Sequence, residues 1–197
     1  MEKKAEKVVS KGEKFDNVKY WIEHGVDIEK RRISLVGAID EDTFRIVKRA
    51  IRRMVDSNTN DIYLDISSFG GDIYYGFALY DVLRACKGVN IYTTAEGPVM
   101  SAGILVYLAG DYRRAAPNVK FMIHEVSVED ISELRAHQFK VEGKELESIN
   151  KDMAEIISEY TKHTPETWLK MMEKDIYLKK GDALKKGLVT EGEYAIE

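Results

Sequence analysis

The chain has almost none of the residues needed for disulfide or cysteine-metal chemistry. Cys86 is the only cysteine among 197 residues, which excludes an internal disulfide and any site with several cysteine ligands. We interpret Cys86 as a small buried hydrophobic residue. The sequence also contains no Walker-type glycine-lysine loop, so we do not expect this chain to bind ATP.

The chain also lacks a basic excess and an apolar leader. Its 30 Lys and Arg residues are interspersed with 34 Asp and Glu residues, giving a net charge of −4, so we expect no nucleic-acid partner. Residues 1–14 alternate lysine and glutamate without an apolar core, which predicts neither a signal peptide nor a membrane anchor. We therefore expect a cytoplasmic protein that does not bind membranes.

The hydrophobic content is sufficient for one complete core. With 44% hydrophobic residues in 197, we expect a single domain over residues 17–197. Residues 1–16 are charged and poor in apolar side chains, which predicts a mobile N-terminal arm. No internal repeat or low-complexity segment is present.

The hydrophobic pattern alternates between strands and helices. Asp40 to Thr43 provides acids and a capping side chain ahead of a helix whose core face carries Phe44, Val47, Ile51 and Met54. Because strands and helices alternate, we predict an α/β fold with a largely parallel sheet, with ligands at the carboxyl ends of the strands. Strands are expected at residues 33–37, 61–66, 90–94 and 120–124, and helices at 44–54, 76–84 and after residue 101.

A long charged segment follows the last of these strands. Residues 128–162 are poor in glycine and carry an apolar stripe, which predicts one helix of roughly thirty residues, about 45 Å long. The helix either projects and buries its stripe against a second copy of the chain, or folds back on its own sheet. The stripe consists of Leu146, Ile149, Met153, Ile156 and Tyr160.

Ser101 and His124 form the most informative pair in the sequence. Ser101 lies in the stretch 97–103, directly before an apolar run, and His124 closes a later apolar strand. An imidazole can take the proton of a serine hydroxyl, and a helix starting at the serine offers free N–H groups where negative charge develops. The loop 67–71 could supply a second N–H donor. The alternative is that Ser101 only caps a turn.

These segments together resemble the Clp protease proteolytic subunit (ClpP) family. The resemblance spans residues 33–189 and rests on four motifs: Asp61 to Leu64 running into Gly70-Gly71, then 97–103, 117–124 and 175–189. It implies a crotonase-like α/β fold of repeated β-β-α units with a projecting handle helix over about 128–162. It also implies a serine endopeptidase.

The family's functional residues can be carried over position by position. Ser101 matches the nucleophile, His124 the general base and Asp175 the acid that orients the imidazole. The backbone N–H groups of Gly70 and Ala102 fall where the family builds its oxyanion hole. This chemistry requires no metal and no organic cofactor. The residues expected to contact substrate are Gly71, Asp72, Glu125 and Val126.

The resemblance also implies an assembly. The family forms seven-membered rings, stacked in pairs as a tetradecamer, so we expect a homo-oligomer joined through the handle helix. Substrates that enter such a chamber must be unfolded polypeptides. An ATP-dependent unfoldase is therefore the implied partner.

Three features depart from the family pattern. Phe69 and Asp72 replace a proline and an apolar residue in the glycine loop, and residues 125–129 lack the usual glycines. Asp72, Glu125 and Glu129 would make the substrate groove acidic and favour basic segments. The N-terminal segment also differs from the family's apolar start, which suits a divergent member encoded by a phage or mobile element, such as a head-maturation (prohead) protease.

Two other functions remain open from the sequence. The chain could be a catalytically silent ring subunit, if Asp175 is displaced, because the spacing from His163 to Asp175 is about three residues shorter than usual in the family. The same topology also supports acyl-CoA chemistry in the enoyl-CoA hydratase relatives. Ser101 and His124 favour the peptidase over both alternatives.

Overall fold

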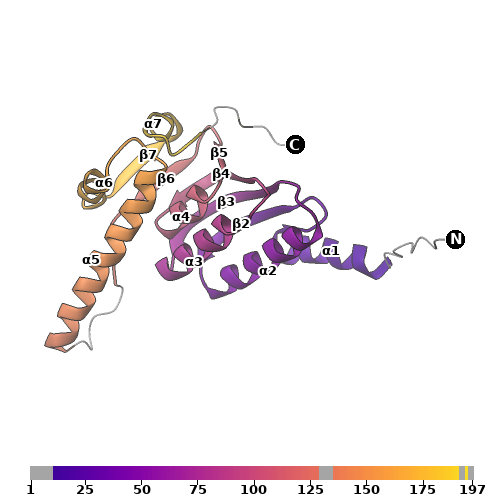
Figure 1. Ribbon diagram of the computed structural model, residues 1–197, viewed down its shortest axis with the longest axis horizontal. Helices are drawn as coiled ribbons and strands as arrows, with labels where there is room; N and C mark the ends of the chain where they lie inside the picture. Colours follow the sequence, from indigo (N-terminus) through magenta and orange to yellow (C-terminus); the bar gives the residue numbers. More distant parts are fainter. Residues whose placement is uncertain (1–10, 129–134, 191–193, 195–197) are drawn as a thin grey trace.

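The protein is built on one mixed β-sheet flanked by helices (Figure 1). The computed structural model describes residues 11–128, 135–190 and 194. Within them the strands are β1 (Val26–Asp27), β2 (Arg32–Ile39), β3 (Ile62–Gly71), β4 (Ile91–Met100), β5 (Tyr112–Ala115), β6 (Lys120–Ile123) and β7 (Ile176–Lys179). The helices are α1 (Lys11–His24), α2 (Glu41–Ser57), α3 (Ile73–Arg84), α4 (Ala102–Leu108), α5 (Ala136–Glu159), α6 (Pro165–Met172) and α7 (Lys180–Lys186).

The centre of the sheet is parallel and its two edges are antiparallel. The strand order is β1-β2-β3-β4-β6-β7, and β5 pairs with the first half of β4. Strands β2, β3, β4 and β6 pair in parallel, whereas β1 and β7 pair antiparallel to their neighbours. The predicted α/β class with a largely parallel sheet is therefore confirmed. Because β3, β4 and β6 are parallel, their carboxyl ends meet at one edge of the sheet.

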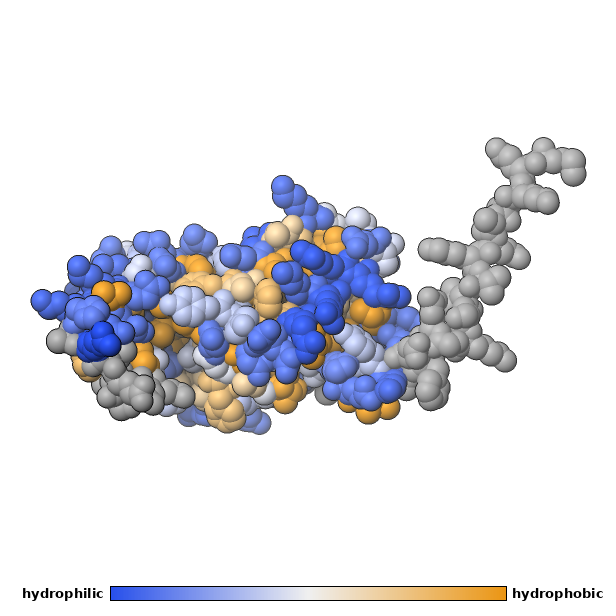
Figure 2. All heavy atoms as spheres, turned by 90° about the horizontal axis from the view of Figure 1, so that it is seen from below, coloured by the Kyte–Doolittle hydropathy of each residue, from blue (hydrophilic) through white to orange (hydrophobic). Residues whose placement is uncertain are grey.

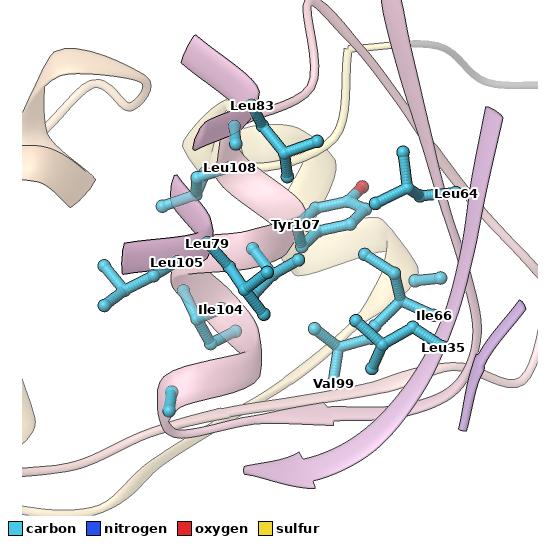
Figure 3. Close-up of a cluster of buried hydrophobic side chains, with 14 of the residues drawn as sticks. Leu35, Leu64, Ile66, Leu79, Leu83, Val99, Ile104, Leu105, Tyr107 and Leu108 are labelled. Atoms are coloured by element: carbon cyan, nitrogen blue, oxygen red, sulfur yellow. The ribbon is translucent and has the colours of Figure 1, made fainter. Parts of the chain in front are cut away.

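The main core lies between the sheet and helices α3 and α4 (Figure 3). All seven residues of α4 are buried, which explains why the run after Ser101 is continuously apolar. Tyr107 is fully buried, and its hydroxyl donates to the carbonyl of Arg114 at 3.1 Å. A fully buried helix directly after Ser101 fixes the position of that residue relative to the sheet.

The N-terminal arm is shorter than expected. Helix α1 begins at Lys11 and ends at His24, so part of the predicted arm 1–16 is helical; residues 1–10 lie outside the described residues. Helix α2 begins where the sequence predicts, because the Asp40 carboxylate accepts the N–H of Thr43 at 2.8 Å. Helix α3 begins at Ile73, earlier than the predicted residue 76.

Helix α5 is the predicted handle, but it is shorter. It covers 24 residues rather than the whole of 128–162, and its N-terminal half projects from the domain (Figure 1). Val128 is not helical, and residues 129–134 lie outside the described part of the chain. Ile149, Met153 and Ile157 in the second half are buried against the domain. One half of the helix therefore folds back on its own domain and the other half projects, whereas burial of the stripe against a second copy stays a prediction.

The face of the sheet away from α3 and α4 carries aromatic and charged side chains. The rings of Tyr63 and Tyr92 stack with centroids 5.1 Å apart, and Tyr92 stacks on Tyr112 at 4.6 Å. Arg32 pairs with Asp65 at 2.9 Å beside them. Burial is the main reason that the pKa of Asp65 lies above its usual range. Among the described helices, none has the length and apolarity that a bilayer span requires.

Candidate active site

Ser101 lies at a sharp corner between β4 and α4. Its backbone has φ 52° and ψ −127°, a region that residues other than glycine rarely adopt. The corner is held by two backbone hydrogen bonds: the Ser101 N–H donates to the Met122 carbonyl at 2.9 Å, and the Ser101 carbonyl accepts from Ile104 at 2.9 Å. A strained strand-to-helix turn of this kind presents a nucleophile at the top of a sheet.

The glycine loop at the end of β3 packs directly against Ser101. Gly70 has φ +102°, and a Cβ added there would lie 2.6 Å from Ser101 Cβ and 2.9 Å from the Met100 carbonyl. Only glycine therefore fits at this position. The loop 67–71, which the sequence analysis expected to supply an N–H donor, therefore lies directly against Ser101.

The N–H groups near Ser101 differ in their partners. Ala102 is the first residue of α4, so its N–H has no acceptor within the helix. The N–H of Gly70 instead donates to Ser68 Oγ at 3.1 Å, which engages it within its own loop. Gly70 could act as an oxyanion donor only after this hydrogen bond opens. Ser68, whose side chain is fully buried, is a contact that the sequence analysis missed.

His124 follows β6 directly and lies near Ser101. Strands β4 and β6 are parallel with Met100 opposite Met122, so the two strand ends place residues 101 and 124 at the same edge of the sheet. His124 is half-buried, as is Ser101. The arrangement required by the sequence prediction, a serine and a histidine on one side of the molecule, is therefore satisfied at the backbone level.

Asp175 precedes β7 on the other side of His124. Strands β6 and β7 are antiparallel with Ile123 opposite Ile176, so continuing the register by one residue places Asp175 opposite His124. Asp175 is exposed and has φ 47°. A positive φ at a non-glycine residue is uncommon, and aspartate tolerates it better than most residues.

Ser101, His124 and Asp175 lie at adjacent strand ends, but their side chains are not hydrogen-bonded to one another. No hydrogen bond joins Ser101 Oγ to the His124 ring, and no hydrogen bond or ion pair joins that ring to Asp175, although all three residues are described. The nearby strand ends supply the correct order, nucleophile then base then acid, but the hydrogen-bonded chain between them is not formed. Catalytic hydrogen bonds are often long or misaligned without substrate, so this geometry does not exclude a triad.

Asp72 has a structural task that the sequence analysis did not assign. Its carboxylate caps α3 by accepting the N–H groups of Tyr74 at 2.8 Å and Tyr75 at 3.4 Å. The Tyr74 hydroxyl in turn donates to Glu145 Oε1 on α5 at 3.2 Å. Gly71 and Asp72 are both exposed beside the site, where the sequence analysis expected substrate to lie.

The segment after His124 is held by α5. The N–H of Val126 donates to Asn150 Oδ1 at 2.8 Å, and Asn150 is only 7% exposed. Val126 therefore cannot offer this N–H to a substrate strand while the bond is intact. Glu125 is exposed, whereas Glu129, the third acid of the predicted groove, lies outside the described residues.

Comparisons with known proteins identify the family. The Clp protease family model matches residues 20–191, most of the chain. The chain belongs to the Clp protease family. It is 31% identical to the ATP-dependent Clp protease proteolytic subunit of Deinococcus radiodurans over 82% of this chain and 80% of that protein. It is 29% identical to the ATP-dependent Clp protease proteolytic subunit 2 of Treponema denticola, over 83% of this chain and 82% of that protein.

A solved structure supports the same assignment. The fold of this Clp protease family chain matches that of a ClpP1 point mutant from Listeria monocytogenes with a TM-score of 0.75. The two are 25% identical, and the match covers 82% of this chain and 90% of the other. The predicted family resemblance and fold class are therefore confirmed.

Proposed function

We propose that this chain is a serine endopeptidase, the proteolytic subunit of a self-compartmentalised Clp-type protease that hydrolyses unfolded polypeptides in the cytoplasm. The observation that carries the proposal is the corner at Ser101, a strained strand-to-helix turn in which the Ser101 N–H donates to Met122 of β6, the strand directly before His124. Membership of the Clp protease family supports the same conclusion.

The proposed mechanism is acyl transfer in two halves. Ser101 Oγ attacks the peptide carbonyl while His124 takes its proton and then passes it to the leaving amine. The N–H of Ala102, together with an N–H of the glycine loop, stabilises the oxyanion. Water then attacks the acyl-enzyme, with His124 as base, and frees Ser101. Asp175 would hold the imidazole in one tautomer and stabilise its charged form.

In this proposal, the triad is completed by assembly or substrate. Ser101, His124 and Asp175 lie at the ends of adjacent strands, so their side chains are proposed to meet when the particle assembles or substrate binds. Phe139 and Val141 on the projecting half of α5 are 47% and 64% exposed, which leaves apolar surface for a second copy of the chain. We expect heptameric rings stacked as a tetradecamer. The relatives are named as proteolytic subunits of an ATP-dependent Clp protease, and we propose an ATP-dependent unfoldase as the partner of this chain.

Labelling with a fluorophosphonate tests the proposal. We expect modification of Ser101 in the assembled particle, located by mass spectrometry of the digested protein, and no labelling of Ser101→Ala. Particle mass, measured in parallel, should be the same for both proteins. Cleavage of an unfolded peptide by Ser101→Ala at the parent rate would refute the mechanism.

The same experiment separates the enzyme from a catalytically silent ring subunit. The unlinked side chains of Ser101, His124 and Asp175 favour that second reading. A silent subunit would assemble normally, yet it would resist the fluorophosphonate and leave unfolded peptides intact. Labelling together with cleavage excludes it.

A further inference from the structure

The outer face of α2 carries a concentrated positive charge. Five basic residues fall within nine positions of this helix, and the opposite face is buried at Val47, Ala50, Ile51 and Met54. Residues three or four apart share one side of a helix, so all five lie on the solvent side. We call this set the α2 basic face: Arg45, Lys48, Arg49, Arg52 and Arg53.

Three members of the α2 basic face have no ion-pair or hydrogen-bond partner for their side chains among the described residues. Arg45 pairs with Asp42, and Lys48 lies over the Phe44 ring at 4.8 Å. Arg49, Arg52 and Arg53 are exposed, and none of them forms an ion pair or side-chain hydrogen bond with the described part of the chain. Most other arginines in this protein are bonded; Arg31, for example, donates to three backbone carbonyls. Unpartnered arginines clustered on one helix face are free to bind an anionic group from outside.

The α2 basic face is short and bounded by acids. Its first and last residues are eight positions apart, which is about 12 Å along the helix axis. Glu41 and Asp42 precede it, and Asp56 follows it, all of them exposed. Figure 2, which views the molecule from below, shows strongly hydrophilic side chains gathered over this part of the surface.

We propose that the α2 basic face is the docking site for an acidic segment of a partner protein. An extended polypeptide advances about 3.3 Å per residue, so about four acidic residues match the length of the face. Carboxylates can form bidentate hydrogen bonds with arginine, which gives the docking its geometry. This surface lies outside the Ser101 site, and its role does not depend on the peptidase activity.

The local charges favour a polypeptide over a nucleic acid or a membrane. A duplex carries a phosphate charge about every 1.7 Å and continues past any short patch, so it would meet Glu41, Asp42 and Asp56. An anionic bilayer would meet the same acids. A short acidic segment ends before it reaches them, and the net charge of −4 gives no wider field to hold a polyanion.

A cavity beside the α2 basic face could accept an apolar side chain of the partner segment. A cavity of about 500 Å³ lies between α1, β2 and α2; its lining combines the apolar side chains of Trp21, Val36 and Ile46 with polar ones that include Glu23, His24 and Ser34. Ile46 is one helical turn from Arg49, so the cavity borders the α2 basic face. Val36 is 74% exposed there. A partner segment with an apolar residue beside its acids would therefore fill both features.

Fluorescence anisotropy with a defined probe tests the proposal. The probe is a fluorescein-labelled peptide of four glutamates followed by two leucines, added to full-length protein carrying Ser101→Ala so that it cannot be cleaved. We expect saturable binding that weakens with added salt. The variant R49E/R52E/R53E should bind at least tenfold more weakly, whereas R49K/R52K/R53K, which keeps the charge but loses the bidentate hydrogen bonds, should bind with an intermediate affinity.

A matched control variant shows whether a change in net charge alone weakens binding of the probe. K162E/K170E/K185E changes the charge equally at three exposed positions elsewhere, and it should bind the probe within about twofold of the parent. Circular dichroism melting curves check that every variant is folded. Equal binding by the R49E/R52E/R53E variant would overturn the proposal, as would no binding by the parent.

Two further outcomes would show that the α2 basic face binds something other than an acidic segment. Tighter binding of a 20-nucleotide single-stranded DNA than of the acidic peptide, lost in R49E/R52E/R53E, would overturn the proposal in favour of nucleic acid. A change of particle mass in that variant without any peptide binding by the parent would instead identify the face as a contact between copies of this chain.

Discussion

The candidate active site has two sides that the structure holds with different rigidity: a nucleophile side around Ser101 and an acid side around Asp175. On the nucleophile side, Gly70 and Ser101 fit so closely that a single methyl group has no room, and two backbone hydrogen bonds fix the corner. On the acid side, Asp175 is exposed, and Val126 in the segment after His124 donates its N–H to Asn150. Ser101, the proposed nucleophile, is therefore held in position within the single chain, whereas Asp175, the proposed acid, would have to be brought into place.

The largest effect is expected from Asp175→Asn, which tests the acid side. If the carboxylate orients His124, an amide presents the wrong hydrogen-bonding group, and turnover of an unfolded peptide should fall by up to about 10⁴-fold. The matched control is Asp182→Asn, an exposed aspartate in the first turn of α7, which should keep parent activity. Activity within a few-fold of the parent for Asp175→Asn would show that another group orients the imidazole.

Gly70→Ala tests the nucleophile side and should have the next largest effect. The added Cβ would collide with Ser101 Cβ at 2.6 Å, so the corner must shift and peptidase activity should fall by on the order of 100-fold or more. Backbone strain adds a loss of unfolding free energy of about 1–3 kcal/mol, measured by urea denaturation.

Gly37→Ala is the control for that strain. Gly37 has φ +111°, yet nothing lies within 4 Å of its added Cβ. This variant should therefore lose stability through the backbone alone and retain its activity. Equal activity losses in Gly37→Ala and Gly70→Ala would mean that strain, rather than displacement of Ser101, controls the rate.

Asn150→Ala should have the smallest effect and would measure how loosely the acid side is held. Removing the buried amide leaves the Val126 N–H without its acceptor, which should cost about 1–3 kcal/mol of unfolding free energy. Asn150→Asp retains an acceptor oxygen and should recover part of that loss. The exposed neighbour Ser148 supplies the control, since Ser148→Ala should leave the denaturation midpoint unchanged. If Asn150→Ala also leaves the denaturation midpoint unchanged, then the hydrogen bond between Val126 and Asn150 does not stabilise the fold.

The sequence predicted the nucleophile side better than the acid side for a physical reason. Ser101, Gly70 and the run after residue 101 are fixed by local chemistry: a glycine turn, a strand end and a buried helix. These features leave signals in adjacent residues. The contacts of Ser68 with Gly70 and of Asp72 with α3 are also local. A polar side chain can hydrogen-bond to several different groups, however, so its actual partner cannot be predicted from the sequence.

The errors fall where distant segments meet. Asn150 and Val126 are 24 residues apart, so nothing in the local pattern of either predicts their bond. The handle was predicted over 128–162 because its polar residues are compatible with helix throughout, whereas the helix begins at Ala136. The helical start of α1 at Lys11 was missed because charged residues there resemble a disordered arm. Long-range contacts and helix boundaries of this kind depend on how the whole chain folds.

The register between β4 and β6 restricts how this chain can change. Met100 pairs with Met122, and the proposed nucleophile Ser101 and the proposed base His124 are the first residues after β4 and β6. Inserting or deleting one residue within either strand would rotate every later side chain to the opposite face and separate the pair. Length variation in related chains should therefore be absent from these two strands and concentrated in the connections around them, which a survey of natural insertions can test.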